Sequence, residues 1–191
     1  MYERKRGPNA PKIDVRDFLA DPAKLVKDVR MEVELNFYSP QIPRDQIIKN
    51  CYDWVSANIK RSFEHGTDYW KFPTETFFSR EGDCEDGTIL LANMLLANKI
   101  PPKDVAVAIL KTGEEFHAVV LYQWRRVLDW THYCNGWTWK NVREALWYLW
   151  TVDYAYTTKE NLELFDSDSA NSASCCRTFV RKNFRDGLLR I

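Results

Sequence analysis

The sequence predicts an α+β domain in which a buried helix with a cysteine at its N-terminus packs on an antiparallel β-sheet. Residues 84–97 are apolar around almost the whole helical circumference, which indicates a helix buried on nearly all sides. Three segments typical of strands then follow closely, at 105–110, 116–124 and 126–133, with "KTGEE" as the first turn. Consecutive strands joined by short turns pair antiparallel, so we expect the helix to cover one face of a small sheet.

Helices are also predicted outside this core. Residues 43–63 carry a stripe of apolar side chains at i, i+3/i+4 spacing, formed by Ile47, Ile48, Cys51, Trp54, Val55 and Ile59. Residues 14–30 are helix-prone, and 141–150 form a further predicted helix with Asn141 as its cap.

We expect a single domain over residues 1–165, with its motif-bearing core at about 43–133 and an N-terminal helical extension at 1–42. Residues 166–191 are predicted to be a polar linker followed by a basic amphipathic tail, which docks on its own domain or on a protein partner.

The charge balance limits the classes of partner. The chain has 191 residues, of which 27 are basic and 27 are acidic, so no overall field favours nucleic acid or an anionic membrane. No stretch approaches the roughly 20 apolar residues of a membrane span. The basic start is not followed by an apolar segment, as a signal peptide requires, so we expect a cytoplasmic protein.

The five cysteines do not predict a disulfide framework or a cysteine-rich zinc site. Their number is odd and none forms a C-x-x-C pair; they are Cys51, Cys84, Cys134, Cys175 and Cys176. Reduced thiols are expected instead, which leaves room for one that reacts.

Cys84 lies in "GDCEDG", at the start of the apolar helix. Asp83 is a good N-cap, and Asp86 three residues later resembles a capping box. Cys84 then occupies the first turn, where free amides and the helix dipole favour a thiolate, so we expect its pKa to be lowered. The alternative is that Cys84 is simply a small core residue.

A thiol nucleophile needs a base, and His117 is the best placed of the three histidines. Asp129 follows it by an even number of residues, so on an antiparallel pair the two share a face only if the loop is odd or a bulge intervenes. We expect a loop of about three to five residues; one centred on Gln123 would set His117 opposite Asp129. The predicted imidazole–carboxylate distance is roughly 2.6–3.2 Å, with the other ring nitrogen toward Cys84. An aspartate there fixes the histidine tautomer and supports the imidazolium.

Other assignments stay open for these residue types. His117 alone would more often be a hydrogen-bonded core histidine, and Asp129 is costly to bury unpaired. His132 and Cys134 form a second Cys–His pair, but the "CNG" that begins at Cys134 indicates a turn. His65, next to a glycine, is expected in a loop.

Together these motifs resemble the transglutaminase-like cysteine-enzyme superfamily, and most closely its bacterial transglutaminase-like cysteine proteinases. The resemblance rests on "DYWKFPTETFFSREGDCEDGTILLANMLL", "FHAVVLY" and "VLDWT", in that order. It implies a papain-like, transglutaminase-like fold with the triad Cys84, His117 and Asp129, and an oxyanion hole that includes the Cys84 amide. By the same resemblance, Trp70 or Trp54 is a candidate for an oxyanion tryptophan; Glu75 of "PTET" is a candidate for lining the site.

The expected function is therefore thiol-dependent hydrolysis of an amide in a protein or peptide, through an acyl-enzyme. The alternatives are amine transfer to glutamine, as in transglutaminases, and an inactive member used for peptide binding or assembly. Some proteinases of this branch bind calcium beside the cysteine, which would point to Asp83, Glu85 and Asp86. Because helix capping already uses such carboxylates, we expect no cofactor, with calcium at these three residues as the alternative.

Overall fold

The computed structural model describes residues 15–19, 28–62, 69–113, 115–134, 137, 139–150 and 155–157. Its elements, in chain order, are α1 (Arg16–Leu19), α2 (Val29–Leu35), α3 (Arg44–Asn58), β1 (Lys60–Arg61), α4 (Pro73–Ser79), β2 (Glu81–Gly82), α5 (Cys84–Ala97), a 3-10 turn (Pro102–Asp104), β3 (Val105–Thr112), β4 (Glu115–Tyr122), β5 (Arg126–Leu128), α6 (Trp139–Ala145), β6 (Leu146–Trp150) and β7 (Ala155–Thr157).

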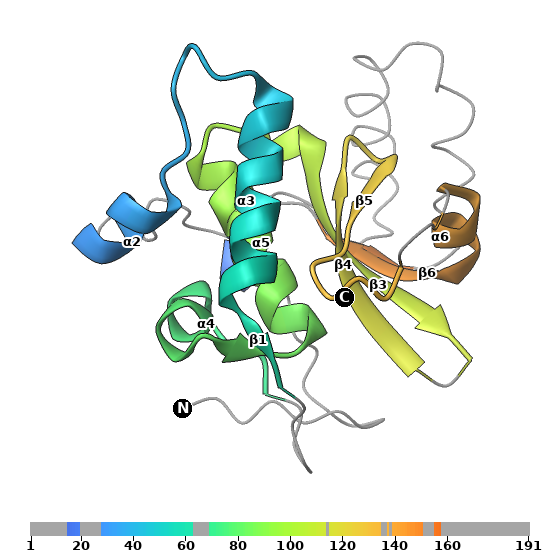
Figure 1. Cartoon of the computed structure of the whole chain (residues 1–191). Helices are drawn as coiled ribbons and strands as arrows, with labels where there is room; N and C mark the ends of the chain where they lie inside the picture. The colour runs from blue at the N-terminus through green and yellow to red at the C-terminus, as the bar shows by residue number, and fades with distance from the viewer. Residues whose placement is uncertain are drawn as a thin grey trace.

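The main sheet has five strands in the order β5-β4-β3-β6-β7, and every neighbouring pair is antiparallel. A short parallel pair, β1 with β2, leads into α5. Figure 1 shows α3 running alongside α5 on one side of the sheet and α6 on the other. The predicted α+β class and the antiparallel sheet are confirmed.

Strand alternation divides the interior into two cores. Along β3, Val105, Val107 and Ile109 belong to the core that contains α5, whereas the alternate side chains pack with α6 and β6. This is the period of two that a strand buried on both faces requires, and it explains the continuous apolar run from 105 to 110. The sheet is therefore the middle layer of three.

Helix α5 is buried as predicted, with the apolar residues from Ile89 to Leu96 at or below 9% exposure. Its one polar interruption, Asn93, donates its amide hydrogens to the carbonyls of Phe18 and Ile89, both at 2.9 Å. A buried amide of this kind costs little once it is hydrogen-bonded, so it ties α1 to the central helix. The helix provides a rigid support for its first residue, Cys84.

Three sequence expectations need correction. The predicted helix at 141–150 ends at Ala145, and Leu146–Trp150 is strand β6, because the β-prone aromatic residues there pair with the second edge of β3. The predicted strand at 126–133 ends at Leu128, so Asp129 lies in a turn. The predicted helix at 43–63 ends at Asn58, and β1 follows.

Several predicted features lie outside the described residues: most of 14–30, His65, Cys175 and Cys176, and the linker and tail over 166–191. The single-domain boundary at residue 165 therefore stays a prediction. Within the part of the chain that the structure describes, none of the helices has the length and apolar character to cross a membrane.

Candidate active site

Cys84 is the first residue of α5, directly after the N-cap Asp83. The Asp83 backbone N–H donates to Asp86 Oδ2 at 3.4 Å, which is one arm of the predicted capping box. The segment enters the helix from β2, whose pairing with β1 fixes the direction of approach. The N-terminal position of Cys84 is thus set by local sequence, as expected.

The early end of β5 brings Cys84 to the sheet. The last β4–β5 pair is Val120 with Leu128, so the backbone of Ala118 has no β5 partner. Side chains of α5 take its place: the Ala118 N–H is hydrogen-bonded to the Cys84 sulfur, and Thr88 Oγ1 donates to the Ala118 carbonyl at 3.1 Å. The thiol is therefore held at the residue that follows His117.

His117 and Asp129 form a buried pair. Nε2 of His117 lies 3.1 Å from Oδ2 of Asp129, and the two residues are 4% and 6% exposed. This distance falls in the predicted range. The contact orients the imidazole and leaves Nδ1 as the ring nitrogen that does not face the carboxylate.

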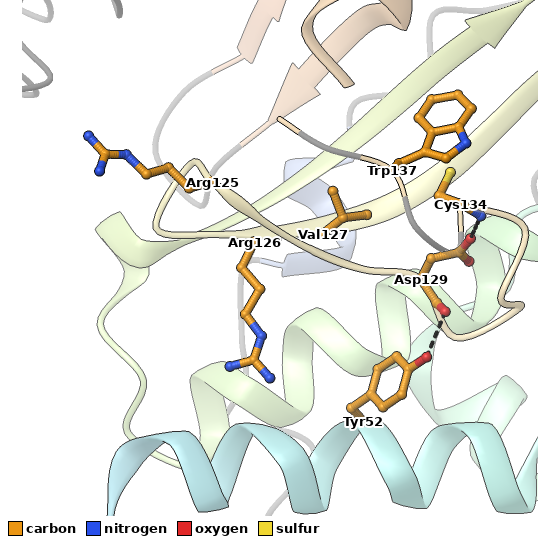
Figure 2. Close-up of a pocket in the computed structure, with 7 residues that line it drawn as sticks. All are labelled: Tyr52, Arg125, Arg126, Val127, Asp129, Cys134 and Trp137. Carbon is orange, nitrogen blue, oxygen red and sulfur yellow. Dashed lines mark hydrogen bonds between the residues drawn. The ribbon is translucent and has the colours of Figure 1, made fainter. Parts of the chain in front are cut away.

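Asp129 is held by three further donors from the turn that follows it. Oδ1 accepts from the Thr131 backbone N–H at 3.0 Å and from its hydroxyl at 2.7 Å, and Oδ2 accepts from the Cys134 N–H at 2.6 Å. Figure 2 shows the carboxylate beside Cys134. Burial alone would raise the pKa of Asp129, but the hydrogen bonds from His117 and Cys134 outweigh it and lower the pKa to about 2.

The loop of the β4–β5 hairpin has an odd number of residues, as is required for His117 and Asp129 to share a face of the sheet. Three residues, Gln123–Arg125, connect the strands, and the register pairs Tyr122 with Arg126. The loop is therefore centred on Trp124, one residue later than the Gln123 centre predicted, and His117 is not directly opposite Asp129. The turn after Leu128 brings the carboxylate back to the imidazole.

The predicted lowering of the Cys84 pKa is wrong for this arrangement. Burial raises the pKa of the thiol well above its ordinary value, and the charge of Glu85 raises it further. The thiol donates to Glu85 Oε2 at 3.1 Å, and Glu85 is itself only 1% exposed. Desolvation next to a carboxylate outweighs the helix dipole and the single N–H bond from Ala118.

Cys84 and His117 are adjacent through Ala118 but are not hydrogen-bonded. Among the described residues, the Cys84 thiol donates a hydrogen bond to Glu85 and its sulfur accepts one from the Ala118 N–H. It forms none with His117. By the alternation along β4, the imidazole projects on the face of the sheet toward α6, where Val119 also points. The predicted approach of Nδ1 to the sulfur stays a prediction.

Cys134 lies beside the His117–Asp129 pair, a position that the sequence did not predict. Its sulfur lies within 4.8 Å of ligand atoms of both His117 and Asp129, and the residue is buried. Burial raises its pKa to about 12, with a further contribution from the Asp129 charge. The sequence signal that could have indicated this proximity is that Cys134 follows Asp129 by only five residues.

His132 is not hydrogen-bonded to Cys134, the second Cys–His pair that the sequence argued against. His132 instead places Nδ1 3.0 Å from the Tyr52 hydroxyl, which also donates to the Asp129 carbonyl at 3.0 Å. Tyr52 thereby ties α3 to the turn that carries Asp129. Nothing in the sequence pattern marked this tyrosine.

Trp130 connects the two halves of the site. Its indole Nε1 donates to the Cys84 carbonyl at 3.1 Å, and the ring is 4% exposed. It lies against Gly87, where a Cβ would come within 2.3 Å of the ring. Only glycine at position 87 allows the indole to reach the first turn of α5, so the residue after Asp129 fixes the start of the cysteine helix.

The three candidates for oxyanion or substrate contacts have structural partners. The Trp54 ring stacks on Phe77 at 5.6 Å, and the Trp70 ring lies 6.3 Å from Phe18 and is 6% exposed. Glu75 caps α4 by accepting from the Phe72 N–H at 2.7 Å. A role in lining the site stays a prediction for all three.

Two of the three acidic residues around Cys84, Asp86 and Glu85, accept hydrogen bonds from protein groups. Asp86 accepts from the Lys71 backbone N–H at 2.7 Å and from its ammonium at 3.0 Å, so its charge is already neutralised by a cation. Glu85 accepts from the Cys84 thiol. Burial raises the pKa of Asp86 despite the lysine.

Comparison with solved structures identifies the fold. LapG of Legionella pneumophila superposes with a TM-score of 0.53 at 18% identity, over 87% of this chain and 99% of that one. The chain shares its fold with LapG. An EGTA-treated LapG structure (TM-score 0.52, 20% identity) covers 78% of this chain and 88% of its own length. A calcium-bound one (0.50, 19%) covers 78% and 82%. No family model and no curated protein matches the chain. At these identities the likeness establishes the fold alone.

Proposed function

We propose that this protein is a cysteine hydrolase that cleaves an amide bond in a protein or peptide through an acyl-enzyme on Cys84. One observation carries the proposal: the Cys84 sulfur accepts a hydrogen bond from the backbone N–H of Ala118. Ala118 directly follows His117, whose Nε2 contacts Asp129. A thiol at a helix start, a histidine and a carboxylate that orients it are the parts that thiol catalysis needs. The likeness to LapG, a bacterial cysteine protease, supports the same class.

The first chemical step moves the thiol proton to His117. Because Nε2 faces Asp129, the acceptor is Nδ1, and Cys84 must turn its sulfur away from Glu85 to reach it. The raised pKa of Cys84 means that the resting thiol is neutral, so proton transfer accompanies attack on the substrate carbonyl. Asp129, with its lowered pKa, stays ionised and stabilises the imidazolium.

The later steps follow from the same groups. The oxyanion accepts hydrogen bonds from backbone amides, including that of Cys84, whose position is fixed by the bond from Trp130 to its carbonyl. His117 then gives its proton to the leaving amine, and the C–N bond breaks to leave a thioester. Water, deprotonated by His117, releases the acyl group and restores the thiol.

Amine transfer is the nearest alternative, because it differs only in the acceptor of the acyl group. The test is to incubate the reduced protein with a proteome-derived peptide mixture, with and without a labelled primary amine. We expect new peptide termini without amine and their loss in Cys84→Ala. Amine incorporation without hydrolysis would replace the proposal by a transglutaminase, and neither reaction in a folded protein would favour a binding module.

Cys134 is the matched control for the nucleophile. It lies near the same His117–Asp129 pair but is 5% exposed and does not lie at a helix start. We expect Cys134→Ala to retain hydrolysis. Hydrolysis that depends on Cys134 and not on Cys84 would overturn the assignment of the nucleophile.

A further inference from the structure

A compact set of metal-binding side chains lies on the face of the sheet toward α6. One ligand atom each from His117, Asp129 and Cys134 lies within 4.8 Å of the other two, and all three residues are buried. Imidazole, carboxylate and thiolate are the ligand types that zinc takes in proteins. The hydrolase proposed above uses the first two of these residues and has no use for the third.

The distances fit a zinc ion with small adjustments. Zinc lies about 2.0–2.3 Å from its nitrogen, oxygen and sulfur ligands. The three ligand atoms, now within 4.8 Å of one another, would therefore move somewhat closer together when they bind the ion. Nε2 of His117 and Oδ2 of Asp129 are already 3.1 Å apart. Oδ1 keeps its two bonds from Thr131, which hold the carboxylate while Oδ2 turns to the metal.

The charge of the ligands and the space for a water molecule are also suited to zinc. A thiolate and a carboxylate balance the two charges of zinc, so the buried site is neutral when filled. A cavity of about 400 Å³ lined by Asp129 and Cys134 gives room for a water molecule as the fourth ligand. Arg125 and Arg126 line the same cavity, but Figure 2 shows their side chains directed away from the cysteine, and Arg126 pairs with Asp45 at 3.7 Å.

We propose that His117, Asp129 and Cys134 bind zinc, and that zinc there switches off the catalytic base. Binding forms bonds from zinc to Sγ, Oδ2 and Nε2; Cys134 loses its thiol proton to solvent, and the proton on Nε2 moves to Nδ1. With Nδ1 protonated, His117 no longer accepts the proton of Cys84. The zinc site stands by itself, whereas the inhibition rests on the function proposed above.

The test uses the full reduced chain, zinc alone as the probe, and cobalt(II) as a spectroscopic substitute. We expect one zinc bound per chain by calorimetry and, with cobalt, a thiolate charge-transfer band together with the d–d bands of a tetrahedral ion. Cys134→Ser should lose the charge-transfer band and weaken zinc binding by at least about tenfold. Cys84→Ala and Cys51→Ser, the latter a buried cysteine of α3, should keep both.

Inhibition is read from alkylation of Cys84 by iodoacetamide, followed by peptide mapping, which needs no substrate. Zinc should slow this labelling in wild type and not in Cys134→Ser. Zinc binding that survives Cys134→Ser but disappears in Cys84→Ala would place the ion on the nucleophile and overturn the site, as would cobalt spectra of wild type without a thiolate band. Cys134-dependent binding without slower labelling would overturn the inhibition alone. Absence of hydrolysis in any form would remove the proposed function and leave the zinc site intact.

Discussion

Asp129→Asn separates the structural from the catalytic contribution of the carboxylate. The oxygen of asparagine can keep both bonds from Thr131, but its amide group would then face the Cys134 N–H and Nε2 of His117, where Oδ2 now accepts at 2.6 and 3.1 Å. Two donors would oppose each other at Cys134. The imidazole would have to move its proton to Nδ1, the nitrogen that must be free to act as a base.

The cost in stability can be worked from the pKa. Asp129 is held at about 2 against an ordinary value of 3.8, which corresponds to about 2 kcal/mol of native-state stability. That figure already contains the hydrogen bond from the Cys134 N–H, so we expect a loss of at least about 2 kcal/mol at pH 7. Because the folded pKa is the lower one, the carboxylate's contribution is complete above pH 3.8 and is lost as the pH falls through about 2. The difference between wild type and variant should shrink over that window.

The assay pairs urea unfolding with hydrolysis of a peptide that wild type cleaves. Turnover should fall by about 10³–10⁴-fold in protein that is still folded, as expected for a triad with the wrong histidine tautomer. Asp53→Asn, an exposed aspartate paired with Lys49 on α3, is the matched control and should leave both unchanged. Unchanged turnover in folded Asp129→Asn would make the His117–Asp129 pair purely structural and refute the reasoning.

Three further outcomes are expected. Burial is the main cause of the raised pKa of Cys84, and the Glu85 charge raises it further. Glu85→Gln removes that charge, so iodoacetamide should label Cys84 at lower pH than in wild type, with Glu81→Gln as the exposed control; identical pH profiles would contradict a contribution from Glu85. Gly87→Ala puts a Cβ 2.3 Å from the Trp130 ring and should cost about 1–3 kcal/mol in urea unfolding, part of which Trp130→Leu should relieve; an additive double variant would argue against this contact. Calcium should leave the melting temperature unchanged because Lys71 already neutralises Asp86; a calcium-dependent rise that Glu85→Gln abolishes would show that these carboxylates bind the ion.

Local rules were enough for the parts of the fold that one segment decides. The start of α5 follows from Asp83 and Asp86, its burial from the apolar run, and the odd β4–β5 loop from the parity of His117 and Asp129. Each depends on a period or a capping pattern that is readable in a short stretch of chain. The His117–Asp129 distance falls in the predicted range, but the turn after Leu128 brings the carboxylate to the imidazole, and not the predicted strand pairing.

The predictions that failed concern features that depend on contacts between distant segments of the chain. Leu146–Trp150 is a strand because β3 has a second edge to pair, which no local pattern of that segment reveals. The pKa of Cys84 is raised because α5 packs its first turn against β4 and buries the thiol with Glu85, so desolvation overrides the helix dipole. Trp130, Tyr52 and Cys134 belong to the site through a turn whose path sequence alone did not specify.

The most direct test of the central claim is to trap the acyl-enzyme and locate it. Wild type and Cys84→Ser, incubated with a cleaved peptide and quenched in acid, should each carry the N-terminal fragment on residue 84, as a thioester and as a slowly hydrolysed ester. His117→Ala should reduce this acylation while Cys134→Ala leaves it in place. An adduct on Cys134, or peptide cleavage that persists in Cys84→Ala with no adduct on residue 84, would contradict the account.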